Sequence, residues 1–189
     1  MDLVLIRHPA VAIDAGICYG QTDAPLLRDA HESASELTER MRALNVPVCV
    51  DGWHASPLRR CASLAQALGS ARIDARLSEM HFGAWEGCAW DGIDRALIDA
   101  WAADIEHARP HGGESLAQFG ERVIAWFDDA SADASDAMHV IAHAGVMRVL
   151  AAHVLRIDRA SVLQWALDFS GIVWLRRSSS AWTIVRWNV

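Results

Sequence analysis

The sequence predicts an α/β protein, a three-layer sandwich whose mostly parallel central sheet is flanked by helices. Short aliphatic runs typical of buried strands alternate with segments whose apolar residues recur every three or four positions. Strands that alternate with helices of this length indicate a largely parallel sheet with helices on both faces. The 189 residues are enough for a sizeable core, show no internal repeat or linker, and are expected to form a single domain over 1–189.

The first part of the chain contains two predicted strands and two predicted helices. Residues 2–7 are short and aliphatic, as in a buried parallel strand. Residues 33–44 predict a helix with one apolar face, made of Ala34, Leu37, Met41 and Leu44. Residues 47–50, Pro-Val-Cys-Val, predict a second strand. Ser56 and Pro57 then predict a helix start, with Ser56 as the N-cap and Pro57 at the first helical position.

The rest of the chain continues the alternation. Glycines and tryptophans over 74–93 predict a loop with short helical pieces. Ser115 and Gln118 have the spacing of a capping box, which predicts the start of a further helix. The remaining predicted elements are a helix over 94–106, a strand over 139–142, a helix over 145–156, and terminal strands over 172–177 and 182–187. The last of these could be a sheet edge that pairs with a second copy in a homo-oligomer.

The charge of the chain excludes several classes of function. The formal net charge is −7, which disfavours a nucleic-acid partner because such proteins usually present a basic face. All seventeen basic residues are Arg, so neither a Schiff-base lysine nor a P-loop lysine is present. Arg is well suited to bidentate contacts with phosphate, so a small anionic substrate remains compatible with this composition.

The cysteines and the hydropathy pattern bear on location. The four cysteines, at 18, 49, 61 and 88, are widely spaced and form no C-x-x-C pair, so neither a zinc site nor a redox pair is indicated. The start of the chain lacks the basic residues of a signal peptide, and no apolar run approaches the length of a membrane span. We therefore expect a cytoplasmic protein with no membrane partner.

Two histidines each follow a short apolar run. The run 3–6 leads into Arg7-His8, and the run 140–142 leads into His143. Open α/β sheets form their active sites beyond the carboxyl ends of their strands, so these side chains suggest phosphoryl chemistry. His139 and His143 could bind zinc on a helix, but on a strand they lie about 13 Å apart. The β-branched residues between them favour the strand, so no metal is expected. Taken singly, each histidine also fits a structural role.

Two further segments carry candidate residues. Arg59 and Arg60 fall in the first turns of a predicted helix, where backbone N–H groups attract anions. This placement is understandable if Arg60 binds an anion, whereas Arg59 is expected to face solvent. Glu79 lies in a segment rich in Met, Phe and Trp, which suits a general acid, although an exposed loop carboxylate would look the same.

In this order the motifs resemble one family. The matching segments are Arg7-His8, Ser56-x-Leu58-x-Arg60, the Glu79 segment ending Phe-Gly-x-Trp-Glu-Gly, Gly112-Gly113-Glu114-Ser115, and His143. Each is weak alone, but together they resemble the histidine phosphatase superfamily, which includes the phosphoglycerate mutases, over roughly residues 3–155. The segment 17–26 is most similar to the small bacterial branch that contains α-ribazole phosphatase of cobalamin synthesis.

The resemblance implies a role for each matching residue. His8 would be the nucleophile that accepts the phosphoryl group, with Arg7 and Arg60 holding the phosphate. His143 would contact the phosphate from the other side, and Glu79 would protonate the leaving oxygen. Gln21 and Thr22 would lie near the phosphate, and no cofactor would be needed. The positions that depart from the family pattern are Pro9, Leu64, His81 and Ala144.

The sequence therefore predicts a cofactor-independent phosphatase that acts on a small phosphorylated substrate through a phosphohistidine. Trp85, Trp90 and His81 could stack on a heterocycle such as that of α-ribazole 5′-phosphate, or simply pack in the interior. Other enzymatic readings are a phosphoglycerate mutase-like enzyme, which the short chain disfavours, or a phosphatase for sugar phosphates, nucleotides or protein phosphohistidine. A catalytically silent protein that binds a phosphorylated ligand is the alternative of another class.

Overall fold

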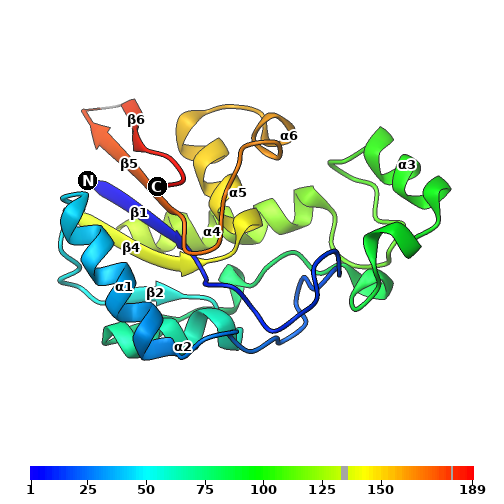
Figure 1. Cartoon of the computed structure of the whole chain (residues 1–189). Coiled ribbons are helices and arrows are strands. Elements are labelled where there is room, and N and C mark those ends of the chain that lie inside the picture. The colour runs from blue at the N-terminus through cyan, green and yellow to red at the C-terminus, as the bar shows by residue number, and fades with distance from the viewer. Residues whose placement is uncertain (133–135, 180) are drawn as a thin grey trace.

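A computed structural model of the chain describes residues 1–132, 136–179 and 181–189. Within these residues, six strands form one mixed sheet in the order β3-β2-β4-β1-β5-β6 (Figure 1). The first four of these are mutually parallel, whereas β5 and β6 are antiparallel to their neighbours. The strand bounds are β1 Asp2–Arg7, β2 Trp53–Ala55, β3 Ala71–Ile73, β4 Ala137–Ala142, β5 Ile172–Ser178 and β6 Ala181–Arg186.

Helices cover both faces of this sheet, which confirms the predicted three-layer α/β architecture. The α-helices are α1 Ala30–Ala43, α2 Arg59–Leu68, α3 Arg95–Ala103, α4 Leu116–Ala132, α5 Ala144–Leu155 and α6 Arg159–Val162. The segment predicted as a loop with helical pieces contains the 3₁₀ helices Ala75–Leu77, Gly83–Trp85 and Trp90–Gly92. Figure 1 shows α3 standing at one end, away from the layers.

The alternation along β1 divides the core into two parts. Leu3 and Leu5 are buried in the cluster built with α4 and α5, whereas Val4 and Ile6 are buried in the cluster built with α1 and α2. This two-sided burial explains why the strand has no polar residue between its ends, since both faces are covered. β1 ends at Arg7 beside the end of β4, and the candidate residues begin at this point.

Two predictions of local structure were wrong. Residues 47–50 are not a strand: they run as an irregular segment in which Val48 is 78% exposed, and the strand β2 follows at Trp53–Ala55. The helix α2 begins at Arg59 with Leu58 as its N-cap, not at Pro57 with Ser56. Ser56 Oγ accepts from the Leu58 backbone N–H at 3.3 Å, and it also contacts the ring of His143 at 2.8 Å. The short elements β3 and α6 were not predicted.

Other local predictions were confirmed. The helix α1 begins at Ala30, slightly earlier than expected, because Asp29 caps it by accepting from the backbone N–H groups of His31 and Glu32. Ser115 and Gln118 form the reciprocal bonds of a capping box at the start of α4. β6 is one of the two outer strands of the sheet, and its pairing with a second copy stays a prediction. Among the described residues, no helix is both long and apolar enough to span a membrane.

Candidate active site

The candidate residues meet where three neighbouring strands end. His8 follows β1, His143 follows β4, and Ser56 follows β2, which are adjacent in the sheet. The register pairs Arg7 with Ala142, so the two histidines leave the sheet side by side. Their ring centroids are 5.2 Å apart, and the ring planes meet at 63°. The expectation that the two strand-end histidines lie together is therefore met by the sheet topology.

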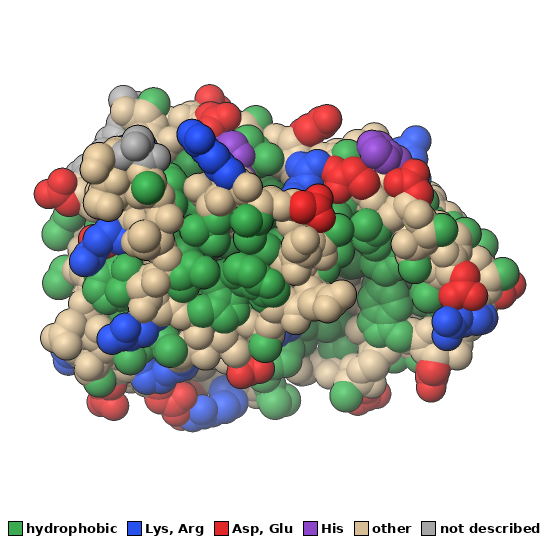
Figure 2. Space-filling view, turned by 90° about the horizontal axis from the view of Figure 1, so that it is seen from above, with side chains coloured by type: hydrophobic (Ala, Val, Ile, Leu, Met, Phe, Trp, Pro, Cys, Tyr) green, Lys and Arg blue, Asp and Glu red, His purple; other side chains and the backbone are tan. Residues whose placement is uncertain are grey.

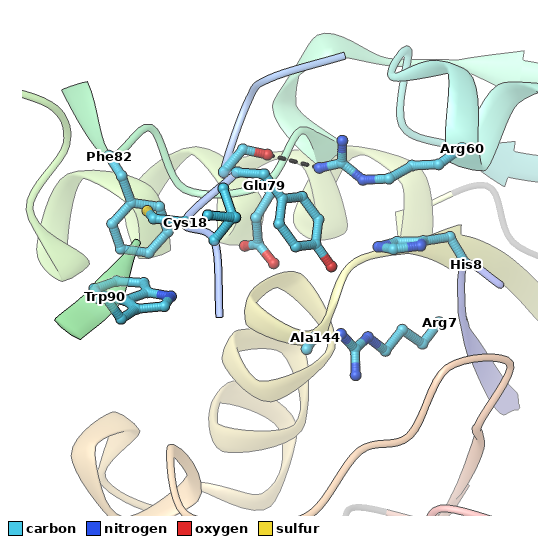
Figure 3. A pocket seen from close by; sticks show the side chains of 11 residues that line it. Arg7, His8, Cys18, Arg60, Glu79, Phe82, Trp90 and Ala144 are labelled. Atoms are coloured by element: carbon cyan, nitrogen blue, oxygen red, sulfur yellow. Dashed lines mark hydrogen bonds between the residues drawn. The ribbon is translucent and has the colours of Figure 1, made fainter. Parts of the chain in front are cut away.

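His8 is held in one tautomer. Its ring is 2% exposed, and Nδ1 lies 2.7 Å from the carbonyl oxygen of Pro9. A carbonyl only accepts, so Nδ1 carries the proton and Nε2 keeps its lone pair. Burial, followed by the positive charge of Arg60, lowers the pKa of His8 to about 3. The ring is therefore neutral over the physiological range, and it lines a cavity of about 130 Å³ (Figure 3).

Arg60 is fully buried and ties several segments together. Its Nη2 donates to the Gly20 carbonyl at 2.6 Å and its Nη1 to the Thr22 carbonyl at 2.7 Å. Its Nε donates to Nδ1 of His143 at 3.2 Å. A guanidinium has five N–H donors, so these bonds leave two for a ligand. None of the three acceptors is an anion, which makes Arg60 a buried positive charge facing the cavity. Arg59, in contrast, is exposed as expected.

Arg7 is positioned by a segment that sequence reasoning missed. Its Nη1 donates to the Leu167 carbonyl at 2.5 Å, and the ring of Phe169 lies 4.0 Å from its guanidinium carbon. Arg7 Nε is buried and has no hydrogen-bond partner among the described residues. Phe169 also contacts the His8 ring, at 5.6 Å between centroids. No local pattern points to Phe169, because it lies far along the chain and is 41% exposed.

His143 lies behind the cavity wall. Because Arg60 only donates, Nδ1 of His143 is the acceptor of that bond, and its Nε2 carries the proton and donates to Ser56 Oγ. Burial, followed by the charge of Arg60, holds the pKa of His143 well below its usual value. Cys61 Sγ packs against the same ring at 3.5 Å. The structure thus brings His143 to Arg60 and His8, with the neutral ring locked between them.

Glu79 occupies space that a side chain would normally fill. Its Oε2 accepts from the Gly145 backbone N–H at 3.1 Å, in the first turn of α5, and its Oε1 accepts from Met80 N–H at 2.9 Å. A Cβ on Gly145 would lie only 2.2 Å from Glu79 Oε1. The absent side chain at Gly145 therefore lets the carboxylate reach the cavity, which it lines opposite His8 (Figure 3).

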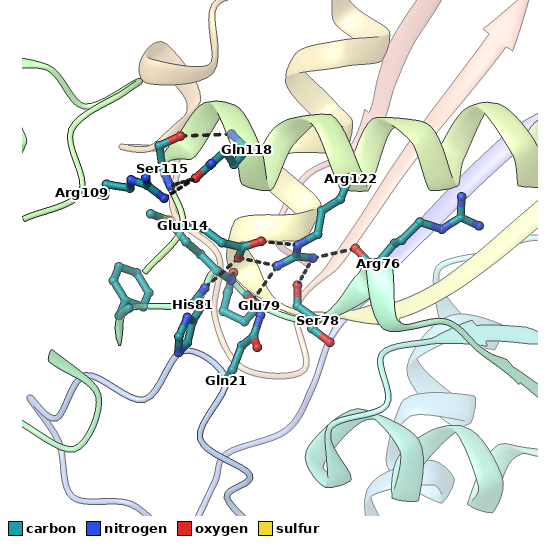
Figure 4. Close-up of polar contacts among 12 residues, drawn as sticks. Gln21, Arg76, Ser78, Glu79, His81, Arg109, Glu114, Ser115, Gln118 and Arg122 are labelled. Atoms are coloured by element: carbon teal, nitrogen blue, oxygen red, sulfur yellow. Dashed lines mark hydrogen bonds and ion pairs between the residues drawn. The ribbon is translucent and has the colours of Figure 1, made fainter. Parts of the chain in front are cut away.

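The backbone that carries Glu79 is fixed by Arg122, a second residue that sequence reasoning missed. Arg122 Nη2 donates to the Glu79 carbonyl at 2.9 Å, and its Nη1 donates to the carbonyls of Ser78 and Arg76, each at 2.8 Å. Glu114 receives the other side of the guanidinium, with Arg122 Nε at 2.6 Å (Figure 4). The Gly-Gly-Glu-Ser motif thus contributes through Glu114, as an anchor for the arginine that holds the segment in place.

Gln21 and Thr22 lie beside the cavity, but their side chains bond to protein groups. Gln21 Nε2 donates to the Glu79 carbonyl at 3.0 Å, and Thr22 Oγ1 donates to Glu86 Oε2 at 2.6 Å. On this side the cavity is lined by Tyr19 and Gly20. A direct contact of Gln21 or Thr22 with phosphate therefore stays a prediction. The bonds of these two side chains hold in place the segment whose carbonyls accept hydrogen bonds from Arg60.

His139 and His143 do not share a site, since His139 lies within β4 and its Nε2 contacts the Pro47 carbonyl at 2.9 Å. Among the described residues, no three His, Cys, Asp or Glu side chains are grouped as metal ligands would be. The arrangement at the cavity is instead a neutral imidazole with a free lone pair, two guanidiniums, and a carboxylate. These groups suit nucleophilic attack on a phosphate whose charge the arginines neutralise.

The buried histidines predict a loss of stability in acid. In the unfolded chain a histidine titrates near pH 6.5, so from about pH 3 to 6.5 the unfolded state binds more protons than the folded one. The stability contributed by His8 is therefore fully present above about pH 6.5 and is lost as the pH falls toward 3. Urea unfolding at about pH 5 and 7.5 should show a decrease of roughly 2 kcal/mol from His8 alone.

The variant His8→Gln is the matched control for this measurement, because glutamine does not titrate. Its free energy of unfolding should fall less between the two pH values than that of the wild type. An identical fall in both proteins would show that His8 titrates normally in the folded state.

Comparisons with known proteins show which proteins this chain is similar to. A model of the histidine phosphatase superfamily (branch 1) matches residues 3–189. Glucosyl-3-phosphoglycerate phosphatase of Mycolicibacterium vanbaalenii is 32% identical over 169 residues, which cover 81% of this chain and 73% of that protein. The crystal structure of a putative α-ribazole-5′-P phosphatase from Escherichia coli K-12 matches 100% of this chain and 96% of its own, with a TM-score of 0.85 and 25% identity. The mycobacterial glucosyl-3-phosphoglycerate phosphatase in complex with VO3 matches 100% of this chain and 98% of its own, with a TM-score of 0.81 and 26% identity.

Proposed function

The chain belongs to the histidine phosphatase superfamily and is a phosphoric monoester hydrolase of that type. We propose that it hydrolyses a small phosphomonoester through a phosphohistidine at His8. The observation that carries the proposal is the free Nε2 lone pair of His8, set by the Nδ1 bond to Pro9 and facing a cavity shared with Arg7, Arg60 and Glu79. A neutral imidazole held in one tautomer is a competent nucleophile at neutral pH.

The proposed reaction has two steps. His8 Nε2 attacks phosphorus while the bond from phosphorus to the ester oxygen breaks, and the Glu79 carboxyl gives its proton to the departing alcohol. Water then attacks phosphorus while the bond from phosphorus to His8 Nε2 breaks. Glu79 accepts a proton from that water, and phosphate leaves. Arg7 and Arg60 bind the phosphoryl oxygens throughout, which supplies the positioning and charge neutralisation that this chemistry requires.

We propose α-ribazole 5′-phosphate as the physiological substrate. The structure of a putative α-ribazole-5′-P phosphatase from Escherichia coli and that of the α-ribazole phosphatase from Shigella flexneri match this chain with TM-scores of 0.85 and 0.84. The motif at residues 17–26 supports the same choice. The sequence relatives named glucosyl-3-phosphoglycerate phosphatase make that sugar ester the specific alternative.

Phosphate release from a substrate panel tests the proposal. The purified protein should hydrolyse p-nitrophenyl phosphate over about pH 5 to 8. Its kcat/KM should be higher for α-ribazole 5′-phosphate than for glucosyl-3-phosphoglycerate or 3-phosphoglycerate. Faster turnover of the glucosyl ester would replace the proposed substrate. Tight binding of these ligands by folded protein with no turnover would indicate the silent binding protein instead.

A further inference from the structure

A second cavity adjoins the one that contains His8. It has a volume of about 440 Å³ and lies between α3 and the body of the molecule, where Figure 2 shows a hollow with hydrophobic walls. Four residues line both cavities, namely Glu79, Phe82, Trp90 and Ala144. The residues that line only the larger one include Trp101, Ile105, Leu116, Phe119 and Leu163. We call this larger space the apolar cavity.

The position of Glu79 relates the apolar cavity to the reaction. Its carboxylate lines both spaces, with His8 and the arginines on one side and the apolar cavity on the other. In the proposed reaction Glu79 gives its proton to the oxygen of the departing alcohol. The carbon skeleton attached to that oxygen must therefore extend past Glu79, and the apolar cavity is the adjoining space of sufficient size.

The walls of the apolar cavity favour a planar apolar group. The indoles of Trp90 and Trp101 are nearly parallel, at 15° with centroids 6.4 Å apart, and Phe82 meets both nearly edge-on. Aromatic faces and edges arranged in this way accept a further ring in stacked or T-shaped contact.

Most of the apolar cavity is lined by uncharged residues. Its charged lining residues are Glu79 and Arg148, and Arg148 gives Nε and Nη2 to the Trp165 carbonyl at 3.2 and 2.9 Å. The remaining walls are apolar, so a planar apolar ring gains free energy by leaving water for this space.

We propose that the apolar cavity binds the alcohol part of the substrate and selects esters of aromatic or heteroaromatic alcohols. This proposal rests on the proposed phosphatase function and deepens it, since it assigns the leaving-group site to residues of α3 and the segment before it. Trp101 is the specificity-determining residue, because it lines the apolar cavity without lining the one that contains His8.

Two alkyl esters test the proposal without changing the chemistry at phosphorus. With 2-naphthylmethyl phosphate and glycerol 3-phosphate, the wild type should show a kcat/KM about tenfold or more higher for the naphthyl ester. Trp101→Ala should lower that value about tenfold, while kcat/KM for glycerol 3-phosphate changes less than about twofold. Trp101→Phe, which keeps an aromatic face, should retain most of the preference. The inhibition constant of inorganic phosphate should be the same in all three proteins.

Trp182→Ala is the matched control, because Trp182 is also half-buried but packs on Phe127 at the outer strand β6. It should leave both kcat/KM values unchanged. Equal loss for the two esters in Trp101→Ala, or no preference in the wild type, would overturn the assignment of the apolar cavity and leave the phosphatase proposal intact. No turnover of either ester by folded wild type would overturn the phosphatase proposal itself, and this one with it.

Discussion

The variant His8→Ala should lose turnover by about 10⁴-fold or more, because it removes the atom that forms the covalent bond to phosphorus. Quenched reactions with labelled substrate should show an acid-labile, base-stable phosphoenzyme in the wild type and none in the variant. Inorganic phosphate should still bind the variant, since Arg7 and Arg60 keep their partners at Leu167, Gly20 and Thr22. Binding without turnover would separate loss of the nucleophile from loss of the site.

A second buried histidine provides the control for this experiment. His139 lies in β4 and contacts the Pro47 carbonyl, away from the cavity. His139→Gln changes a buried imidazole in the same sheet, and it should retain the phosphoenzyme. A labelled phosphoenzyme that persists in folded His8→Ala would refute His8 as the nucleophile and direct attention to His143.

Arg60→Met should lower kcat/KM by about 10³-fold, because the buried guanidinium supplies charge and two free donors to the phosphate. Its present partners are two carbonyls and an imidazole, so no anion among them balances its charge. Bound phosphate would provide that balance. Inorganic phosphate at about 100 times its Kd should stabilise the wild type by about 2.7 kcal/mol, and it should stabilise Arg60→Met far less.

The neighbouring arginine is the natural control. Arg59 is exposed on the same first turn of α2, and its contact is a backbone N–H bond to Asp23 at 2.7 Å. Arg59→Met keeps that bond and should retain both activity and stabilisation by phosphate. Thermal unfolding with and without phosphate measures the second effect for both variants. Equal stabilisation of wild type and Arg60→Met would show that phosphate binds elsewhere.

The sequence predicted the residues that meet at the cavity better than it predicted what holds them. Strand ends on neighbouring parallel strands must meet, so Arg7, His8 and His143 could be placed from two apolar runs. The partners of these residues could not, because they come from distant segments: Phe169 covers Arg7, and Arg122 holds the backbone of Glu79. Such contacts depend on how helices pack on the sheet, which local periodicity does not encode.

The two wrong local predictions differ in origin. Residues 47–50 have the composition of a strand, yet the ladder forms at Trp53–Ala55, where the chain pairs with β4 and β3. There a tertiary pairing outweighed a local preference. Ser56 does accept from the Leu58 N–H as an N-cap would, but the helix itself begins only at Arg59, and the same hydroxyl also contacts His143. The capping box at Ser115 and Gln118 was predicted correctly because both of its partners lie within the same turn.

Gly145 shows that a residue without a functional group can carry a functional constraint. The Glu79 carboxylate occupies the volume where a Cβ would stand, and it bonds to the N–H of the same residue. The residues that positions 79 and 145 can accommodate therefore depend on each other, although the two positions are 66 residues apart in the sequence. A side chain at position 145 would collide with the Glu79 carboxylate, so a substitution of Gly145 is accommodated only after the residue at position 79 has changed. The order in which these two positions can change is therefore fixed.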